Sequence, residues 1–80
     1  MKDYFIKRIK NDSVEFTREY ANDKDIWYQL TMENEGKQLK FRMHNKEEGI
    51  WKIMGSRIPY NLLKLEEDFN ELISKNERSV

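Results

Sequence analysis

The sequence predicts a small α+β fold: an antiparallel β-meander of three to four strands with one C-terminal amphipathic helix packed on one face. Two observations support this prediction. Apolar and polar residues alternate in the middle of the chain with the period of two that strands show, whereas residues 58–75 repeat with the period of a helix. Because 80 residues allow only one hydrophobic core, we expect a single domain over residues 1–80.

The clearest strand signal is a hairpin formed by residues 28–33 and 38–44 around a turn at residues 34–37. An even loop places Glu33 opposite Gln38. Three apolar pairs then share one face of the hairpin: Met32 with Leu39, Leu30 with Phe41, and Tyr28 with Met43. A shift of one residue would set apolar against polar side chains along the whole hairpin, so the sequence predicts this register.

A third strand, Ile50–Met54, follows a second turn at residues 45–49. We expect Gly49 to take the positive φ that longer hairpin loops require near their end. Trp51 and Ile53 then extend the apolar face of the hairpin, because they share its parity.

The N-terminal quarter holds a further strand and a segment with two interpretations. Residues 13–20 alternate, but Arg18 interrupts their apolar face; an inward charge protects an edge strand, so we expect this strand at an edge. Residues 2–10 fit either a strand face with Phe5 and Ile9 or a helical stripe that adds Ile6. The polar turn at residues 10–13 favours the strand, and both interpretations stay open.

The C-terminal helix is predicted from Ile58 to Lys75, with Pro59 at its first position, where a missing N–H costs nothing. Its apolar stripe covers the sheet and consists of Ile58, Leu62, Leu65, Phe69, Leu72 and Ile73. Tyr60 and Leu63 fall outside this stripe.

Charge and composition argue against several classes of function. Fifteen basic residues balance fifteen acidic ones, which disfavours a binder that depends on a surplus of cations. The chain has no cysteine, and its N-terminus lacks the apolar run of a signal peptide. No window approaches the roughly 18 apolar residues of a membrane span. We therefore expect a cytoplasmic protein without membrane contact.

The residues do not form a recognisable catalytic or metal-binding pattern. His44 is the single histidine, and Glu47 and Glu48 follow it in a turn, without a legible orienting partner or ligand set. The run Glu66-Glu67-Asp68 places adjacent carboxylates about 100° apart around a helix, so they cannot converge on one bond. We expect no catalytic residue, no metal, no cofactor and no enzymatic activity.

Apolar residues without a predicted place in the core are the candidate binding site for a protein partner: Trp27, Ile50, Met54, Tyr60 and Leu63. Trp27, Ile50 and Met54 have the parity of the outer sheet face, and aromatic residues are frequent binding anchors. Because a small core supplies little stability, pairing with another chain is expected to help. The leading hypothesis is a protein-interaction module that forms a homodimer, or that serves as a subunit or inhibitor of a larger assembly.

The alternative hypothesis is a nucleic-acid-binding domain. The predicted outer face gathers Lys40, Arg42 and Lys52, with Arg42 and Lys52 expected as cross-strand neighbours. Such a row contacts phosphates, and an aromatic residue beside it stacks on bases.

A resemblance concerns the C-terminal half of the chain. The segments Phe41-Arg42-Met43, residues 49–53, Ile58-Pro59, Leu65-Glu66 and residues 69–73 together resemble small bacterial proteins built as a meander closed by a helix. The resemblance implies the fold alone and carries no functional residue.

Overall fold

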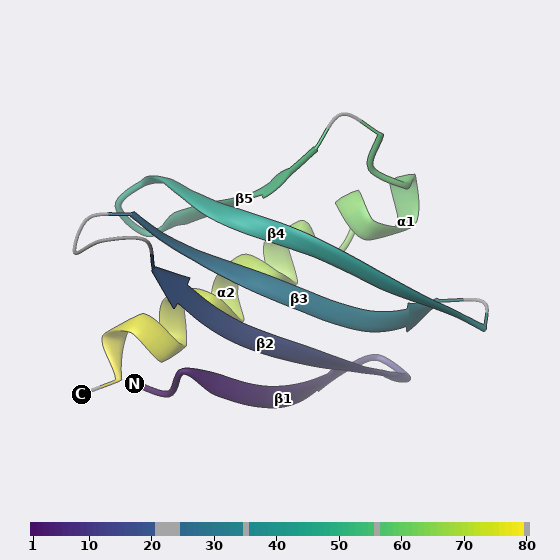
Figure 1. The fold of residues 1–80 in the computed structure, drawn as a ribbon, viewed down its shortest axis with the longest axis horizontal. Coiled ribbons are helices and arrows are strands. Elements are labelled where there is room, and N and C mark those ends of the chain that lie inside the picture. Colours follow the sequence, from purple (N-terminus) through teal and green to yellow (C-terminus); the bar gives the residue numbers. More distant parts are fainter. Residues whose placement is uncertain (21–24, 35, 56, 80) are drawn as a thin grey trace.

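The computed structural model of the protein describes residues 1–20, 25–34, 36–55 and 57–79. Its five strands form one antiparallel sheet in sequential order, with both helices on one side of it (Figure 1). The strands are β1 (Tyr4–Ile9), β2 (Asp12–Tyr20), β3 (Ile26–Asn34), β4 (Lys37–Glu47) and β5 (Ile50–Met54). The helices are α1 (Tyr60–Leu63) and α2 (Glu66–Arg78). The predicted α+β meander is confirmed, and its fifth strand is the N-terminal segment for which a strand and a helix had both been left open.

The β3–β4 hairpin has the predicted register. Glu33 lies opposite Gln38, and the three predicted apolar pairs, from Met32 with Leu39 to Tyr28 with Met43, are all present. In β4 and β5, Met43 lies opposite Ile53, and Gly49 in the turn has a φ of 81° as expected. The alternation of apolar and polar residues was therefore sufficient to set the pairing, because a slip would have exposed the whole apolar face.

Residues 4–9 form a strand, which decides between the two interpretations of the N-terminal segment. β1 pairs with β2 along its full length, and the ring of Phe5 stacks on that of Phe16 at 4.7 Å between centroids. Ile9 is buried, whereas Ile6 points to the other face and is exposed. The turn is shorter than the predicted residues 10–13, because only Lys10 and Asn11 connect the strands.

The predicted edge position of β2 is wrong. β1 covers one side of β2 and β3 covers the other, so the edges of the sheet are β1 and β5. Arg18 does point to the inner face, but its position has another cause. It forms an ion pair with Glu77 from α2, which makes an inward charge tolerable away from an edge.

The single predicted helix from Ile58 to Lys75 is also corrected, since the chain forms two helices. The backbone N–H of Leu65 donates to the carbonyl of Leu62 at 2.9 Å, the tighter i to i−3 pattern that interrupts an α-helix. Pro59 precedes α1 with an extended ψ of 141° rather than occupying a helical position. Leu62 in α1 and Leu65 at the break are both buried.

The core lies between the inner sheet face and the two helices. The fully buried large side chains are Tyr28, Phe16, Phe69, Leu30, Met43, Ile73 and Val14. Phe69 is central, because its ring contacts Phe16 at 6.3 Å and Phe41 at 5.5 Å between centroids. Aromatic contacts at these distances add to the stabilisation from burial.

Candidate protein-interaction surface

The outer face of the sheet points away from both helices, and no described element covers it (Figure 1). On its β3–β5 half it carries six side chains that we call the outer-face patch: Trp27, Arg42, His44, Ile50, Lys52 and Met54. Trp27 lies opposite His44, and His44 lies opposite Lys52, so three strands contribute neighbouring side chains. The predicted outer-face placement of Trp27, Ile50 and Met54 is correct.

Trp27 is the centre of the patch. His44 stacks on its indole at 5.6 Å between ring centroids, and the Arg42 guanidinium lies 5.3 Å from the ring centroid. These neighbours leave the indole half-buried, and its Nε1 has no hydrogen-bond partner among the described residues. A buried donor without a partner costs free energy.

One predicted contact within this patch is wrong. Arg42 lies opposite Met54, and Lys52 lies opposite His44, so Arg42 and Lys52 are not direct cross-strand neighbours. A bulge between Asn45 and Glu47 sets this register. Lys52 also has a partner of its own, because its Nζ lies 3.4 Å from a carboxylate oxygen of Glu66.

Two strands of the outer face carry opposite charges. Glu15 and Glu19 project from β2, and Lys40 and Arg42 project from β4, two strands away. Glu15 accepts a hydrogen bond from the hydroxyl of Tyr4 at 3.1 Å. Opposite charges on separate strands of one face provide complementarity for a partner with the same pattern reversed.

The remaining predicted partner-binding residues lie near β5. Ile50 and Leu63 line one shallow groove of about 350 Å³ between β5 and the helices, and Leu63 is 44% exposed. Tyr60 is 72% exposed on α1, where Lys64 lies over its ring at 5.0 Å. Of the five candidates, the structure therefore joins Ile50 with Leu63 in a groove and places Trp27 with Met54 on the open face.

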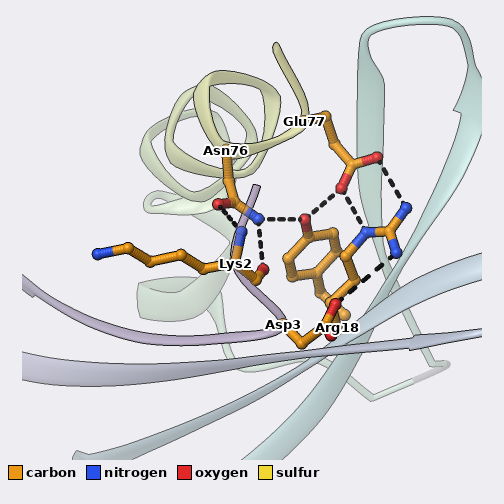
Figure 2. Close-up of polar contacts among 6 residues, drawn as sticks. Lys2, Asp3, Arg18, Asn76 and Glu77 are labelled. Atoms are coloured by element: carbon orange, nitrogen blue, oxygen red, sulfur yellow. Dashed lines mark hydrogen bonds and ion pairs between the residues drawn. The ribbon is translucent and has the colours of Figure 1, made fainter. Parts of the chain in front are cut away.

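A polar cluster on the inner face was not predicted from the sequence (Figure 2). Arg18 Nε donates to Glu77 Oε2 at 2.7 Å, and the Arg18 side chain is only 11% exposed. The hydroxyl of Tyr28 also donates to Glu77 and accepts a hydrogen bond from Asn76 at 2.8 Å. Asn76 in turn bonds the backbone of Lys2 in both directions, at 3.0 and 2.9 Å. The cluster ties the end of α2 to β2, to β3 and to the segment that precedes β1.

The charges of this cluster stabilise one another. The hydrogen bond to Glu77 raises the pKa of Arg18, while burial, and then the bond to Glu77, raise the pKa of the Tyr28 phenol. Burial opposes ionisation of Glu77, but hydrogen bonds from Arg18 and Tyr28 outweigh it and lower the pKa of Glu77. The cluster thus consists of an ionised Arg18–Glu77 pair with the neutral Tyr28 phenol bonded to it. Its contacts fix the end of α2 to the sheet.

A second set of contacts that was not predicted from the sequence satisfies the backbone N–H groups at the β5 edge. The backbone N–H of Trp51 donates to Asn70 Oδ1 at 2.6 Å, and that of Ile53 donates to Glu66 Oε2 at 2.9 Å. Four helical residues advance about 6 Å and two strand residues about 6.6 Å, so an i, i+4 pair on α2 matches alternate residues of β5. The spacing of Glu66 and Asn70 is the signal that could have revealed this contact.

The described parts of the chain contain no cluster of side chains placed to hold a metal ion. His44 stacks on Trp27, Glu47 is exposed at the end of β4, and Glu48 is exposed in the turn that follows. Within residues 1–20, 25–34, 36–55 and 57–79, no three His, Asp or Glu side chains are placed to hold a metal ion. In the same residues, no helix has the length and apolar character needed to cross a membrane.

In comparisons with known proteins, no family model, no curated protein and no solved structure gives a significant match to the chain.

Proposed function

We propose that the protein is a protein-interaction module that pairs with a second copy of itself through the outer face of its sheet. The observation that supports this proposal most is the division of this open face into an acidic β2 and a basic β4. A face that carries both signs on opposite sides of its central strand is complementary to its own image.

The geometry of such a pair follows from a two-fold axis that runs parallel to the strands between the two sheets. This axis places β2 of one copy over β4 of the other, so Glu15 and Glu19 face Lys40 and Arg42. It also places β1 over β5, and β3 over β3. Two sheets packed in this way lie about 10 Å apart with their strands within about 30° of each other.

The apolar residues at the two sides of the face fit the same arrangement. Tyr4 and Ile6 on β1 are exposed, as are Ile50 and Met54 on β5. Tyr4 and Met54 lie at the same level of the sheet, so stacking β1 over β5 would bring these two side chains together. Burial would also compensate for the limited stability that a small core supplies.

The size of the face predicts a dimer of moderate affinity. Five strands about 4.8 Å apart, each contributing about six residues of about 3.3 Å, span roughly 480 Å² per copy. Two copies therefore bury close to the ~1,000 Å² at which specific interfaces begin. The dimer is expected to dissociate on dilution.

Charge reversal with rescue tests the proposal. The variant Glu15→Lys with Glu19→Lys and the variant Lys40→Glu with Arg42→Glu are each expected to be monomeric by light scattering after size exclusion. An equimolar mixture of the two is expected to form a dimer again, because each mutated strand then faces its complement. A control that reverses Asp68 and Glu71 on the exposed side of α2 is expected to dimerise like the original protein. A protein that is monomeric at all concentrations, or two variants that both dimerise alone, would contradict the proposal.

The second candidate function is nucleic-acid binding through Lys40, Arg42 and Lys52. The observation in its favour is that these side chains share the outer face with Trp27. Two contacts weigh against it: Arg42 covers the indole that would stack on a base, and Lys52 is paired with Glu66. A titration of single- and double-stranded probes at low salt tests it, since phosphate contacts are strongest there. No binding at low salt would remove this candidate.

A further inference from the structure

The two edges of the sheet differ in how their backbone groups are satisfied. At the β5 edge, the outward N–H groups of Trp51 and Ile53 donate to side chains of α2. At the β1 edge, no described side chain takes this role. An open strand edge is a template for another strand, so the asymmetry leaves one edge of the sheet available.

The outward-pointing residues of β1 follow from the ladder. The backbone N–H of Arg18 donates to the carbonyl of Asp3 at 2.7 Å, and the β1–β2 register continues without a bulge. Bonded and unbonded residues alternate in an antiparallel pair, so Phe5, Lys7 and Ile9 bond to β2. The N–H and C=O groups of Tyr4, Ile6 and Arg8 therefore point away from β2, and none of them has a partner among the described residues.

The surroundings of this edge are basic and apolar. Between β1 and α2 lies a groove of about 280 Å³ in which Phe5 and Leu72 supply apolar surface. Its charged lining residues are all lysines: Lys2, Lys7 and Lys75. On the other face of β1, Ile6 is 53% exposed between Tyr4 and Arg8. A neighbouring groove, between the end of β1 and α2, adds Arg8 and Lys10 but also Asp68 and Glu71. Basic residues therefore outnumber acidic ones on the inner side of the edge, and the outer side has an apolar position.

We propose that the β1 edge is a strand-addition site for an extended acidic segment of a partner protein, in which acidic and apolar residues alternate. Side chains of an added strand alternate between the faces of the sheet. Acidic residues that face inward meet Lys7 and Lys75, and apolar residues that face outward meet Ile6. The backbone groups of Tyr4, Ile6 and Arg8 supply the hydrogen bonds of the new ladder.

Charge selects the acidic segment over a second copy of the same edge. Pairing β1 with β1 would bring the lysines of two grooves together, and like charges across an interface are unfavourable. The same lysines that protect an edge from its own copies attract a strand of opposite charge.

Hydrogen exchange with a defined probe tests the proposal. The probe is an eight-residue peptide of alternating Glu and Val, compared with a block peptide of the same composition and with an alternating Lys and Val peptide. With the alternating acidic peptide, we expect exchange of the Tyr4, Ile6 and Arg8 amides to slow by about tenfold or more at saturation. The amides of Phe5 and Lys7 already bond to β2 and are expected to change little. Absence of binding, equal binding of the block peptide, or protection without this alternation would overturn the proposal.

Two variants separate strand addition from attraction between charges. Ile6→Pro removes an outward donor without breaking the bonds to β2, a position where an edge strand tolerates proline. It is expected to weaken peptide binding by about tenfold or more, while the matched Ile6→Val variant binds as the original protein does. Lys7→Glu is expected to weaken binding by a similar factor in a sheet whose backbone is unchanged. Undiminished binding to both Ile6→Pro and Lys7→Glu would contradict the proposal. The charge-reversal variants of β4 leave this edge intact, so failure of the dimer and failure of strand addition are separate results.

Discussion

The Nε of Arg18 lies 2.7 Å from Oε2 of Glu77, which joins the second strand of the sheet to the last turn of the C-terminal helix. The contact is charge-assisted and mostly shielded from water, and a second Arg18 nitrogen lies 3.4 Å from the other oxygen of the same carboxylate. Such a pair is far more costly to break on one side than a surface pair, because the remaining charge keeps its burial and loses its partner.

Glu77→Gln is therefore expected to lower the free energy of unfolding by about 1–3 kcal/mol. The amide still reaches Tyr28, but Arg18 loses its close counter-charge and keeps only the exposed carboxylate of Asp3 at 4.0 Å. Urea denaturation at neutral pH measures the change. The matched control is Glu71→Gln, an exposed position on the same helix, which is expected to change stability by less than about 0.5 kcal/mol. Equal effects at both positions would show that the Arg18–Glu77 contact contributes little.

The same carboxylate predicts how stability depends on pH. The pKa of Glu77 is lower in the folded protein than its ordinary value, so between these two values the unfolded state binds more protons than the folded state. The contribution of Glu77 is fully present above the ordinary glutamate pKa of about 4.3 and is lost as the pH falls through the lower folded value. We expect the unfolding free energy to fall more steeply below about pH 4.3 in the original protein than in Glu77→Gln. Parallel pH profiles of the two proteins would contradict this assignment.

Asn70→Ala is expected to open the β5 edge. The substitution leaves the N–H of Trp51 without its 2.6 Å acceptor, and an unsatisfied backbone donor costs about 1–3 kcal/mol when buried. Asn70→Asp keeps an acceptor at the same place and is expected to retain most of the stability. Hydrogen exchange at the Trp51 amide is the direct measurement, and it should accelerate in the alanine variant alone. Unchanged exchange in Asn70→Ala would mean that the edge is closed in another way.

Phe69→Ala and Leu63→Ala are expected to differ strongly, although both residues belong to the C-terminal helical region. Phe69 is fully buried between Phe16 and Phe41, and its truncation is expected to cost about 3–5 kcal/mol, enough to unfold much of so small a protein. Leu63 is 44% exposed, so its truncation should cost about 1 kcal/mol or less. Circular dichroism during thermal denaturation distinguishes the two results.

Much of the sheet could be predicted from the sequence, because every second residue of a strand lies on the same face. The apolar residues of the buried face therefore recur with a period of two. The register of β3 with β4 followed from that alternation alone. The helical break at Leu65 could not be predicted in this way, since Leu62, Leu65 and Phe69 fit one continuous stripe as well as two helices. Periodicity records which side chains are buried and not whether the backbone between them stays regular.

The features of the candidate surfaces also fall into those that followed from the sequence and those that did not. The outer-face placement of Trp27, Ile50 and Met54 followed from the sequence, because parity along a strand is a local property. The contacts of Glu77 with Arg18 and of Asn70 with Trp51 did not follow from it and became visible in the folded chain. These contacts join residues 59 and 19 positions apart. Which side chains meet depends on how the helix lies on the sheet, and no local sequence pattern determines that placement.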